Sequence, residues 1–407
     1  MRKAKASSRL FICLFIIYAL NTFTKIAFSA VTAALIDEAV LTKTQAGTIS
    51  GVFWFLYALG QFAGGALANR HSSLLIKISL IGGMATNILM AFSKGYVPML
   101  TVWSINGILQ CGLWPSVLSL LVNRIIPEQK GKVFVYIAYC YGIGSIMSYL
   151  CTSAVLSVLS WQYLFVFCGI ISALGMIPLL YIEKKLLPVL DVQSGDKNSS
   201  MEVKKLPKGF VFKSGLIFFC IIFFIKSMCE TGIKNWMPTM LLEIHGASPS
   251  FTSLLSVALL ILNLFGVSLC QNIYKKEKED EAKSIFVIYF MILPLMLLLL
   301  NFRNMNMYVL TVVFSLITVL LYGSGQILST YFPRNLHVFG KTAFIGGVMN
   351  CFAAMGNVAA AYVSGLVADL FGWDAIVYMW IAVISVSIIS ALILIPLWNR
   401  FLRKNNL

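Results

Sequence analysis

The sequence predicts an all-α integral membrane protein with twelve transmembrane helices in two six-helix bundles related by pseudo-symmetry. Three observations support this prediction: scarce charge, apolar runs of membrane-spanning length, and similarity between the two halves of the chain. Of the 407 residues, 59% are hydrophobic and only 11% are charged, whereas soluble proteins average about 25% charged residues. The apolar runs match the roughly 20 residues that a helix needs to cross the hydrocarbon core of a bilayer.

The apolar runs define the expected spans in order. They are about 10–36, 46–68, 74–93, 97–122, 133–158, 162–182, 215–242, 251–273, 284–300, 307–330, 342–368 and 373–398. Residues 183–213 are polar and rich in Lys, Ser, Gly and Pro, so we expect a flexible cytoplasmic linker there. An N-terminal bundle at 1–182 and a C-terminal bundle at 214–407 follow. The charge-balanced stretch 275–283 is expected to be a solvated turn.

The net charge of +16 is explained by topology. With the N-terminus in the cytoplasm, all but six of the 31 Lys and Arg fall on cytoplasmic segments. The exceptions are Lys43, Lys94 and Arg303 outside, and Lys25, Lys226 and Lys234 within spans. This bias is the positive-inside rule, and it predicts a multi-pass protein of a bacterial cytoplasmic membrane with both termini in the cytoplasm. The basic rim is expected to meet membrane lipid, and no nucleic-acid partner is expected.

Other functional classes find little support in the sequence. The basic N-terminal residues and the apolar run to about residue 36 indicate an uncleaved first span rather than a cleaved signal peptide. The nine cysteines form no CxxC pair, so we expect no disulfide framework, no metal site and no cofactor. No nucleophile–base set is apparent, and an enzyme is not expected.

The two halves resemble each other. SWQYLFVFCGIIS before the sixth span is similar to GWDAIVYMWIAVIS before the twelfth, with Trp161 and Trp373 in matching places. Lys25 lies 15 residues into the first span and Glu230 lies 15 residues into the seventh. Such a repeat, with polar residues at matching depth, is typical of secondary transporters that work by alternating access around a site between the halves.

Small residues are concentrated in three segments, GQFAGGALANR (60–70), YGIGSIMS (141–148) and FIGGVMNCFAAMGN (344–357). Small residues allow neighbouring helix backbones to approach closely in membranes. The second and third segments lie in the fifth and eleventh spans, which correspond in the two halves. We therefore expect helix–helix contacts there and no phosphate-binding loop, because no Gly-Lys-Ser/Thr follows.

Several strings resemble those of one transporter family. NGILQCGLWPS (106–116) is similar to the span-four signature of the organophosphate:phosphate antiporters, which include bacterial glycerol-3-phosphate and hexose-phosphate transporters. NWMPTML (235–241) is similar to the end of their seventh span, and GLVADLFGWD (365–374) to their span eleven-to-twelve turn. The resemblance covers all twelve spans and implies the major facilitator fold.

The resemblance also implies roles for particular residues. The family binds phosphate with one basic residue in span one, which aligns with Lys25, and another in span seven, where this chain has Glu230. Family tyrosines are matched by Tyr18 and Tyr322, and Tyr139 replaces a span-five histidine. The resemblance implies exchange against inorganic phosphate. The acidic residue in span seven makes proton-coupled symport an equal alternative.

A cytoplasmic gating motif of the superfamily is altered in this chain. GALANRHSS (65–73) has Asn69 where an aspartate is usual, followed by Arg70. Loss of that carboxylate is expected to weaken a charge lock at the inner gate. The span-five Gly-Pro element of drug antiporters is absent, which argues against multidrug efflux.

The charged residues within spans are the main functional candidates, because charge at membrane depth is costly. Lys25 has no acidic neighbour in sequence and is expected either to bind an anion or to pair across the bundle, for instance with Glu230. Lys226, Glu230 and Lys234 are spaced four apart and share a helix face. Glu230 could neutralise a lysine in an intrahelical network, bind a substrate amine, carry a proton, or pair with Lys25 until substrate arrives. Lys234 is expected to be mostly structural.

Polar uncharged residues give further candidates for substrate contact. The three tyrosines named above could hydrogen-bond a substrate or simply pack in the core. Asn106 and Gln110 lie one turn apart in span four, and Asn350 lies in span eleven. Each needs a polar partner, so they are expected to connect helices or to contact substrate.

The sequence therefore predicts a monomeric secondary transporter for a small polar organic anion or amphoteric solute, bearing a phosphate, phosphonate or carboxylate group. Coupling to protons or to anion exchange remains open. The alternative is a transporter-like membrane sensor that binds a sugar phosphate or related anion and signals without net transport.

Overall fold

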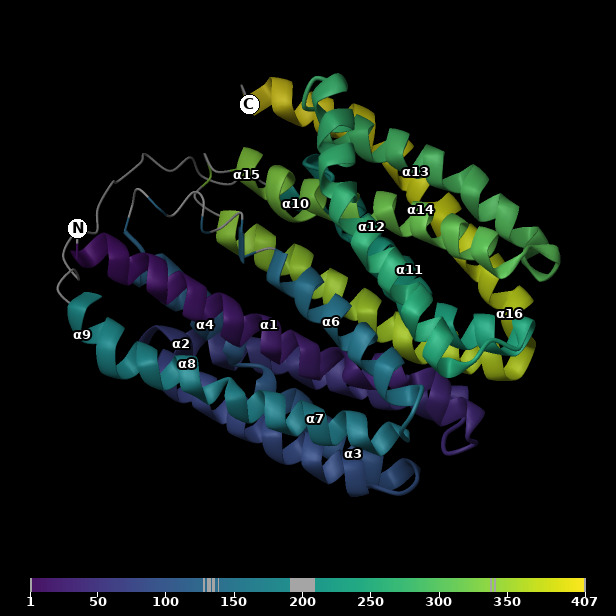
Figure 1. The fold of residues 1–407 in the computed structure, drawn as a ribbon. Helices are drawn as coiled ribbons and strands as arrows, with labels where there is room; N and C mark the ends of the chain where they lie inside the picture. The colour runs from purple at the N-terminus through teal and green to yellow at the C-terminus, as the bar shows by residue number, and fades with distance from the viewer. Residues whose placement is uncertain are drawn as a thin grey trace. The chain divides into compact units, whose positions relative to one another are not determined.

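The computed structural model describes residues 2–126, 129, 133, 136–137, 139–190, 209–336, 339 and 342–405. Helices are the only regular secondary structure of these residues, with no strand among them. The chain divides into two compact units (Figure 1). The first unit takes Met1–Ser199 and Ser248–Val257, and the second takes Ser200–Ala247 and Ala258–Leu407.

The first unit is built around the long helices α1 and α2. Its helices are α1 (Arg2–Asp37), α2 (Lys43–Phe92), α3 (Tyr96–Gln110), α4 (Leu113–Arg124), α6 (Tyr139–Leu156), α7 (Trp161–Leu174), α8 (Met176–Tyr181), the π-helical η1 (Ile182–Leu186) and α9 (Leu187–Leu190). Helix α1 packs against α6 and α7, and α2 packs against α3, α4 and α7 (Figure 1). Two apolar cores result, one around Phe53 and Trp103 and one around Leu14 and Leu113.

The second unit is built around α11 and α16. Its helices are α10 (Phe210–Lys213), α11 (Leu216–His245), α12 (Pro249–Lys276, which begins in the first unit), α13 (Glu281–Leu298), the 3-10 helix η2 (Leu299–Asn304), α14 (Met307–Gln326), the π-helical η3 (Ile327–Tyr331), α15 (Phe332–Asn335) and α16 (Thr342–Asn405). Helix α16 packs against α11 and α13, and α14 packs against the same two helices.

Two very long helices each contain two of the expected spans. Helix α2 covers the spans 46–68 and 74–93 and is broken at His71, where φ is −129° and ψ is 32°. Helix α16 covers the last two spans and is broken at Gly372, where φ is +77°. A glycine adopts positive φ without the steric cost of a Cβ. Both breaks fall in the turns that the sequence predicts.

The described residues contain ten helical segments that are long and apolar enough to cross a membrane, and the one at Ile345–Lys404 includes the Gly372 break. The expected span 46–68 is helical but is not one of the ten. The expected span 97–122 is interrupted by a turn at Cys111–Gly112 between α3 and α4. An all-helical, multi-pass membrane fold is thus confirmed.

The small-residue segments do bring helices together. A Cβ on Gly144 in α6 would collide with Thr22 and the Ala19 carbonyl of α1. At the matching place in the second unit, a Cβ on Gly356 in α16 would collide with the Phe224 carbonyl of α11. Gly347 has no such neighbour within 4 Å, so close packing is confirmed for the C-terminal part of 344–357 and not for its glycine pair.

The close approach at Gly356 predicts a difference between two alanine variants of the same helix. We expect Gly356→Ala to destabilise the protein by about 1–3 kcal/mol, because the added methyl must push back a helix backbone. Gly347→Ala should be neutral or slightly stabilising, since alanine favours helix and the space is open. Thermal denaturation of the two purified variants measures this, and equal melting temperatures would contradict the close packing.

The linker and the charged turn both depart from expectation. Residues 183–190 continue as helix and 210–213 form α10, while 191–208 lie outside the described residues. The turn at 275–283 is not simply solvated, because Asp280 and Glu281 are buried, with exposed fractions of 8% and 0%. Asp280 caps α13 by accepting a hydrogen bond from the Lys283 amide at 3.0 Å. The burial of Glu281 follows from three hydrogen-bond donors, described below.

Candidate functional site

Lys25 is buried in the first unit among aromatic rings. It lies on α1 with an exposed fraction of 4%. Its Nζ donates a hydrogen bond to the Tyr57 hydroxyl on α2 at 3.2 Å. The same Nζ lies 4.6 Å from the Tyr57 ring centroid and 5.7 Å from the Tyr18 centroid. The Tyr18 ring in turn packs on Trp114 of α4, with centroids 4.6 Å apart.

This surrounding stabilises the Lys25 charge without a counter-ion. Within the described part of its unit, no carboxylate lies within ion-pairing distance of Lys25. Aromatic faces attract an ammonium group electrostatically, by up to about 2 kcal/mol when it is desolvated. An ammonium has three N–H donors, and one is directed to Tyr57. The remaining donors and the full positive charge are suited to binding an anion.

Tyr57 is a residue that the sequence interpretation missed. It lies 32 positions from Lys25 along the chain, and a tyrosine in an apolar span is usually a packing residue. No feature of the sequence distinguishes Tyr57 from such a packing residue. Phe53 packs its ring parallel to Tyr57, with centroids 6.0 Å apart, and so fixes the tyrosine in place.

In the second unit, Glu230 is held between two lysines of its own helix. Glu230 has an exposed fraction of 6%. Lys226 Nζ lies 2.5 Å from Glu230 Oε2, and Lys234 forms an ion pair with Oε1. The Lys226 side chain packs over Gly325 of α14, and Lys234 Nζ lies 5.0 Å from the Tyr322 ring centroid. The intrahelical network that the spacing allows is therefore formed, and it carries one net positive charge.

The span-four polar residues link three helices of the first unit. Asn21 on α1 donates to Gln110 Oε1 at 2.8 Å, and Gln110 Nε2 donates to Asn106 Oδ1 at 2.5 Å. Thr86 on α2 donates to the same Asn106 oxygen at 3.0 Å. Asn106 and Gln110 are fully buried. This network supports the interhelical role, and their contact with substrate remains a prediction.

Three further candidate residues lie at exposed positions. Tyr139 at the start of α6 is 44% exposed, and Asn350 in α16 is exposed. Arg70 is exposed, directly before the break in α2, while the side chain of Asn69 lies outside the described residues. Roles for Tyr139 and Asn350 in binding, and for Asn69 and Arg70 in gating, remain predictions.

Two strings that carry the family resemblance meet in the second unit. The rings of Trp236 and Trp373 have centroids 6.4 Å apart. Trp236 Nε1 donates to the Ala360 carbonyl at 3.2 Å and Trp373 Nε1 donates to Glu243 Oε2 at 2.8 Å. Asp374 accepts a hydrogen bond from Arg303 Nη2 at 2.5 Å. The two tryptophans therefore fasten α11 to α16, and the Arg303–Asp374 pair fastens η2 to α16.

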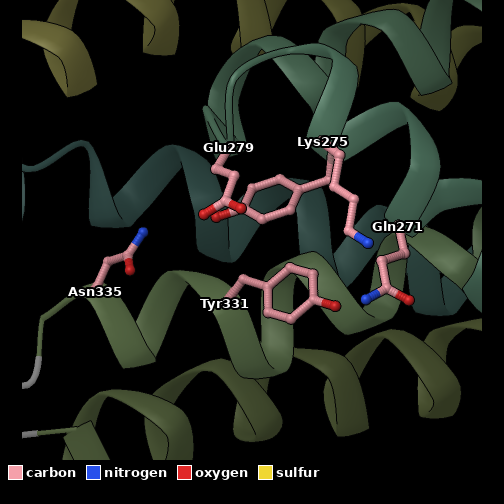
Figure 2. Close-up of a pocket in the computed structure, with 6 residues that line it drawn as sticks. Gln271, Lys275, Glu279, Tyr331 and Asn335 are labelled. Atoms are coloured by element: carbon pink, nitrogen blue, oxygen red, sulfur yellow. The ribbon is translucent and has the colours of Figure 1, made fainter.

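A separate polar pocket lies at the α12–α13 end of the second unit. It has a volume of about 120 Å³. Its lining residues are Gln271, Tyr274, Lys275, Glu279, Tyr331 and Asn335 (Figure 2). The buried Glu281 carboxylate accepts hydrogen bonds from Tyr274 Oη at 2.8 Å, Asn335 Nδ2 at 2.5 Å and Trp398 Nε1 at 2.9 Å. The carboxylate thereby joins α12, α13, α15 and α16.

This arrangement makes Glu281 important for stability. We expect Glu281→Ala to cost about 3 kcal/mol, because it leaves buried donors of Trp398 and Asn335 without an acceptor. Glu277→Ala in the same turn is the matched control. Its side chain is only partly buried and makes no hydrogen bond or ion pair among the described residues, so this substitution should change stability little. Thermal denaturation compares the two, and equal melting temperatures would show that the hydrogen bonds to Glu281 contribute nothing net.

Comparison with known proteins identifies the family. The profile of the Major Facilitator Superfamily matches residues 10–354. This chain belongs to the major facilitator superfamily. Among solved structures, a bacterial homologue of the human lysosomal transporter Spinster, in an inward-facing unoccupied conformation, has a TM-score of 0.73 and 15% identity, with 97% of this chain and 96% of that chain covered. That likeness supports the major facilitator fold alone.

Relatives of this major facilitator protein include sugar-phosphate transporters. A probable hexose phosphate transport protein of Chlamydia pneumoniae is 22% identical, with 96% of this chain and 91% of the relative covered. The membrane sensor protein UhpC of Salmonella typhimurium is 24% identical over 162 residues, or 39% of this chain and 37% of the sensor. The expected relation to organophosphate:phosphate antiporters is confirmed, and the protein is a transporter of the superfamily rather than an enzyme.

Proposed function

We propose that this transporter moves a small organic anion of the sugar-phosphate class across the bacterial cytoplasmic membrane by alternating access, with Lys25 binding the anionic group. The observation that carries the proposal is the buried Lys25 ammonium, which has aromatic neighbours and no carboxylate partner in the described part of its unit. An uncompensated charge within a span is retained for function. The Chlamydia relative named above is consistent with a phosphorylated sugar.

The second unit also carries a net positive charge within a membrane span. The Lys226–Glu230–Lys234 network has two ammonium groups for one carboxylate. The family position that aligns with Glu230 is basic. Lys226 and Lys234 would supply the positive charge of that residue, and Glu230 would hold the two lysines in place. We propose that exchange against inorganic phosphate drives transport. Both termini are proposed to be cytoplasmic because of the positive-inside bias.

Transport by purified protein in proteoliposomes tests the proposal. Vesicles loaded with inorganic phosphate should take up radiolabelled glucose 6-phosphate, and external glucose should not compete. A parallel set without internal phosphate but with an imposed proton gradient separates exchange from symport. Competition by unphosphorylated amino acids or simple carboxylates, with no effect of glucose 6-phosphate, would contradict the sugar-phosphate class.

A sensor is the second candidate, since the chain is similar over 162 residues to a membrane sensor protein. A sensor binds ligand without accumulating it. The discriminating experiment measures glucose 6-phosphate binding by thermal shift and flux in the same preparation. Binding without flux supports the sensor, whereas flux supports the transporter.

A further inference from the structure

The C-terminal part of α16, from Val386 to Lys404, combines a basic cluster with an apolar stripe on one helix face. Arg400, Arg403 and Lys404 are exposed and line, with Pro396 and Asn399, an open depression of about 520 Å³. None of the three basic residues has a carboxylate partner among the residues that the structure describes. Three cations without a counter-ion form a site for an anionic group.

The apolar stripe continues from the same depression along the helix. Val386, Ile389 and Ile393 are 47%, 57% and 45% exposed. They precede Pro396, Arg400 and Arg403 at spacings of three or four residues, which places all six on one face of α16. The opposite face carries the buried Leu394, Trp398 and Phe401, so the stripe is the face that α16 turns away from its own unit.

The length of the stripe matches one leaflet of a bilayer. From Val386 to Pro396 the helix rises about 15 Å at 1.5 Å per residue. Half of the roughly 30 Å hydrocarbon core is the same length. An acyl chain lying on the stripe would therefore bring its headgroup to the depth of the basic cluster.

We propose that this face of α16 binds one anionic phospholipid, with the phosphate in the depression at Arg400, Arg403 and Lys404 and an acyl chain along Val386, Ile389 and Ile393. Basic residues next to a membrane-spanning helix attract anionic lipids. A free phosphate ion would use the cations but not the stripe. The continuity of charge and apolar surface therefore favours the lipid. The site is separate from Lys25 and from the Glu230 network, and it does not depend on the proposed substrate.

Lipid binding by the purified full chain tests this site. Native mass spectrometry should count phosphatidylglycerol and phosphatidylcholine retained by the wild type and by Arg400→Gln/Arg403→Gln/Lys404→Gln. The triple variant should lose affinity for phosphatidylglycerol at least about tenfold, with phosphatidylcholine unchanged. The matched control is Lys275→Gln/Lys276→Gln/Lys278→Gln, which removes the same charge from exposed positions elsewhere in the second unit.

Three outcomes would overturn the proposal. One is an equal loss of affinity in the control, because net charge alone would then explain binding. Another is full competition by soluble glycerol 3-phosphate, which would assign the cluster to a free anion. The third is wild-type affinity in the triple variant. If that variant does not fold, Arg403→Gln and the stripe variant Ile389→Ser replace it, and each should lower phosphatidylglycerol affinity severalfold.

Discussion

Lys25→Ala is expected to abolish measurable glucose 6-phosphate uptake in phosphate-loaded proteoliposomes, with a loss of at least about 100-fold. A desolvated charge contact to an anion is worth about 3 kcal/mol, which is about two decades in affinity. The loss should be this large because, among the residues that the structure describes, Lys25 is the only cation over the Tyr18 and Tyr57 rings. Lys25→Arg keeps the charge and is expected to retain partial uptake.

Lys94→Ala is the matched control for this experiment. Lys94 is exposed, lies between α2 and α3, and undergoes the same chemical change outside the spans. It should transport normally. Size-exclusion chromatography separates a transport defect from misfolding, and removal of the Lys25 ammonium should not by itself unfold the protein, since it breaks no ion pair in the described part of its unit. Wild-type uptake by Lys25→Ala would remove Lys25 from the substrate site.

Much of the fold could be predicted from the sequence because the membrane limits the choices. With no water in the bilayer core, a spanning segment of this composition must be a helix. Its position then follows from the apolar run. What hydropathy did not show was how short the turn between the second and third spans is: α2 breaks at the single residue His71, whereas five positions, 69–73, separate the expected spans. Nor did it show that Glu281 is buried, because that depends on donors 54 and 117 positions away along the chain.

The contacts of the candidate site that lie within one helix could be predicted from the sequence. The Lys226–Glu230–Lys234 network follows from spacing along one helix, and its ion pairs are present. Tyr57 could not be found in this way, because its partner lies on another helix. Asn106 and Gln110 were recognised as polar residues that need partners. Which partner each takes is decided by the packing of α1 and α2 on α3.

Glu230→Gln is expected to be the most destabilising single change in the second unit. It leaves the largely buried side chains of Lys226 and Lys234, 12% and 16% exposed, with no carboxylate between them. Removing one partner of a buried ion pair costs about 3–5 kcal/mol. The melting temperature should fall by about 10 °C on the scale of a domain of this size. The matched control is Glu183→Gln, which breaks the partly exposed Lys77–Glu183 pair at 2.7 Å and should cost at most about 1 kcal/mol.

The double variant Lys226→Met/Glu230→Gln separates the roles that remain open for Glu230. It removes one cation and one anion, so the network keeps its single positive charge on Lys234 and most of the lost stability should return. If Glu230 only holds the lysines in place, this variant should fold and take up glucose 6-phosphate against phosphate. If Glu230 carries a proton or binds a substrate amine, the variant should fold but lose proton-driven uptake or affinity for amine-bearing anions. An unchanged melting temperature for Glu230→Gln alone would mean that the ion pairs contribute nothing net, and the charge in the second unit would then need another explanation.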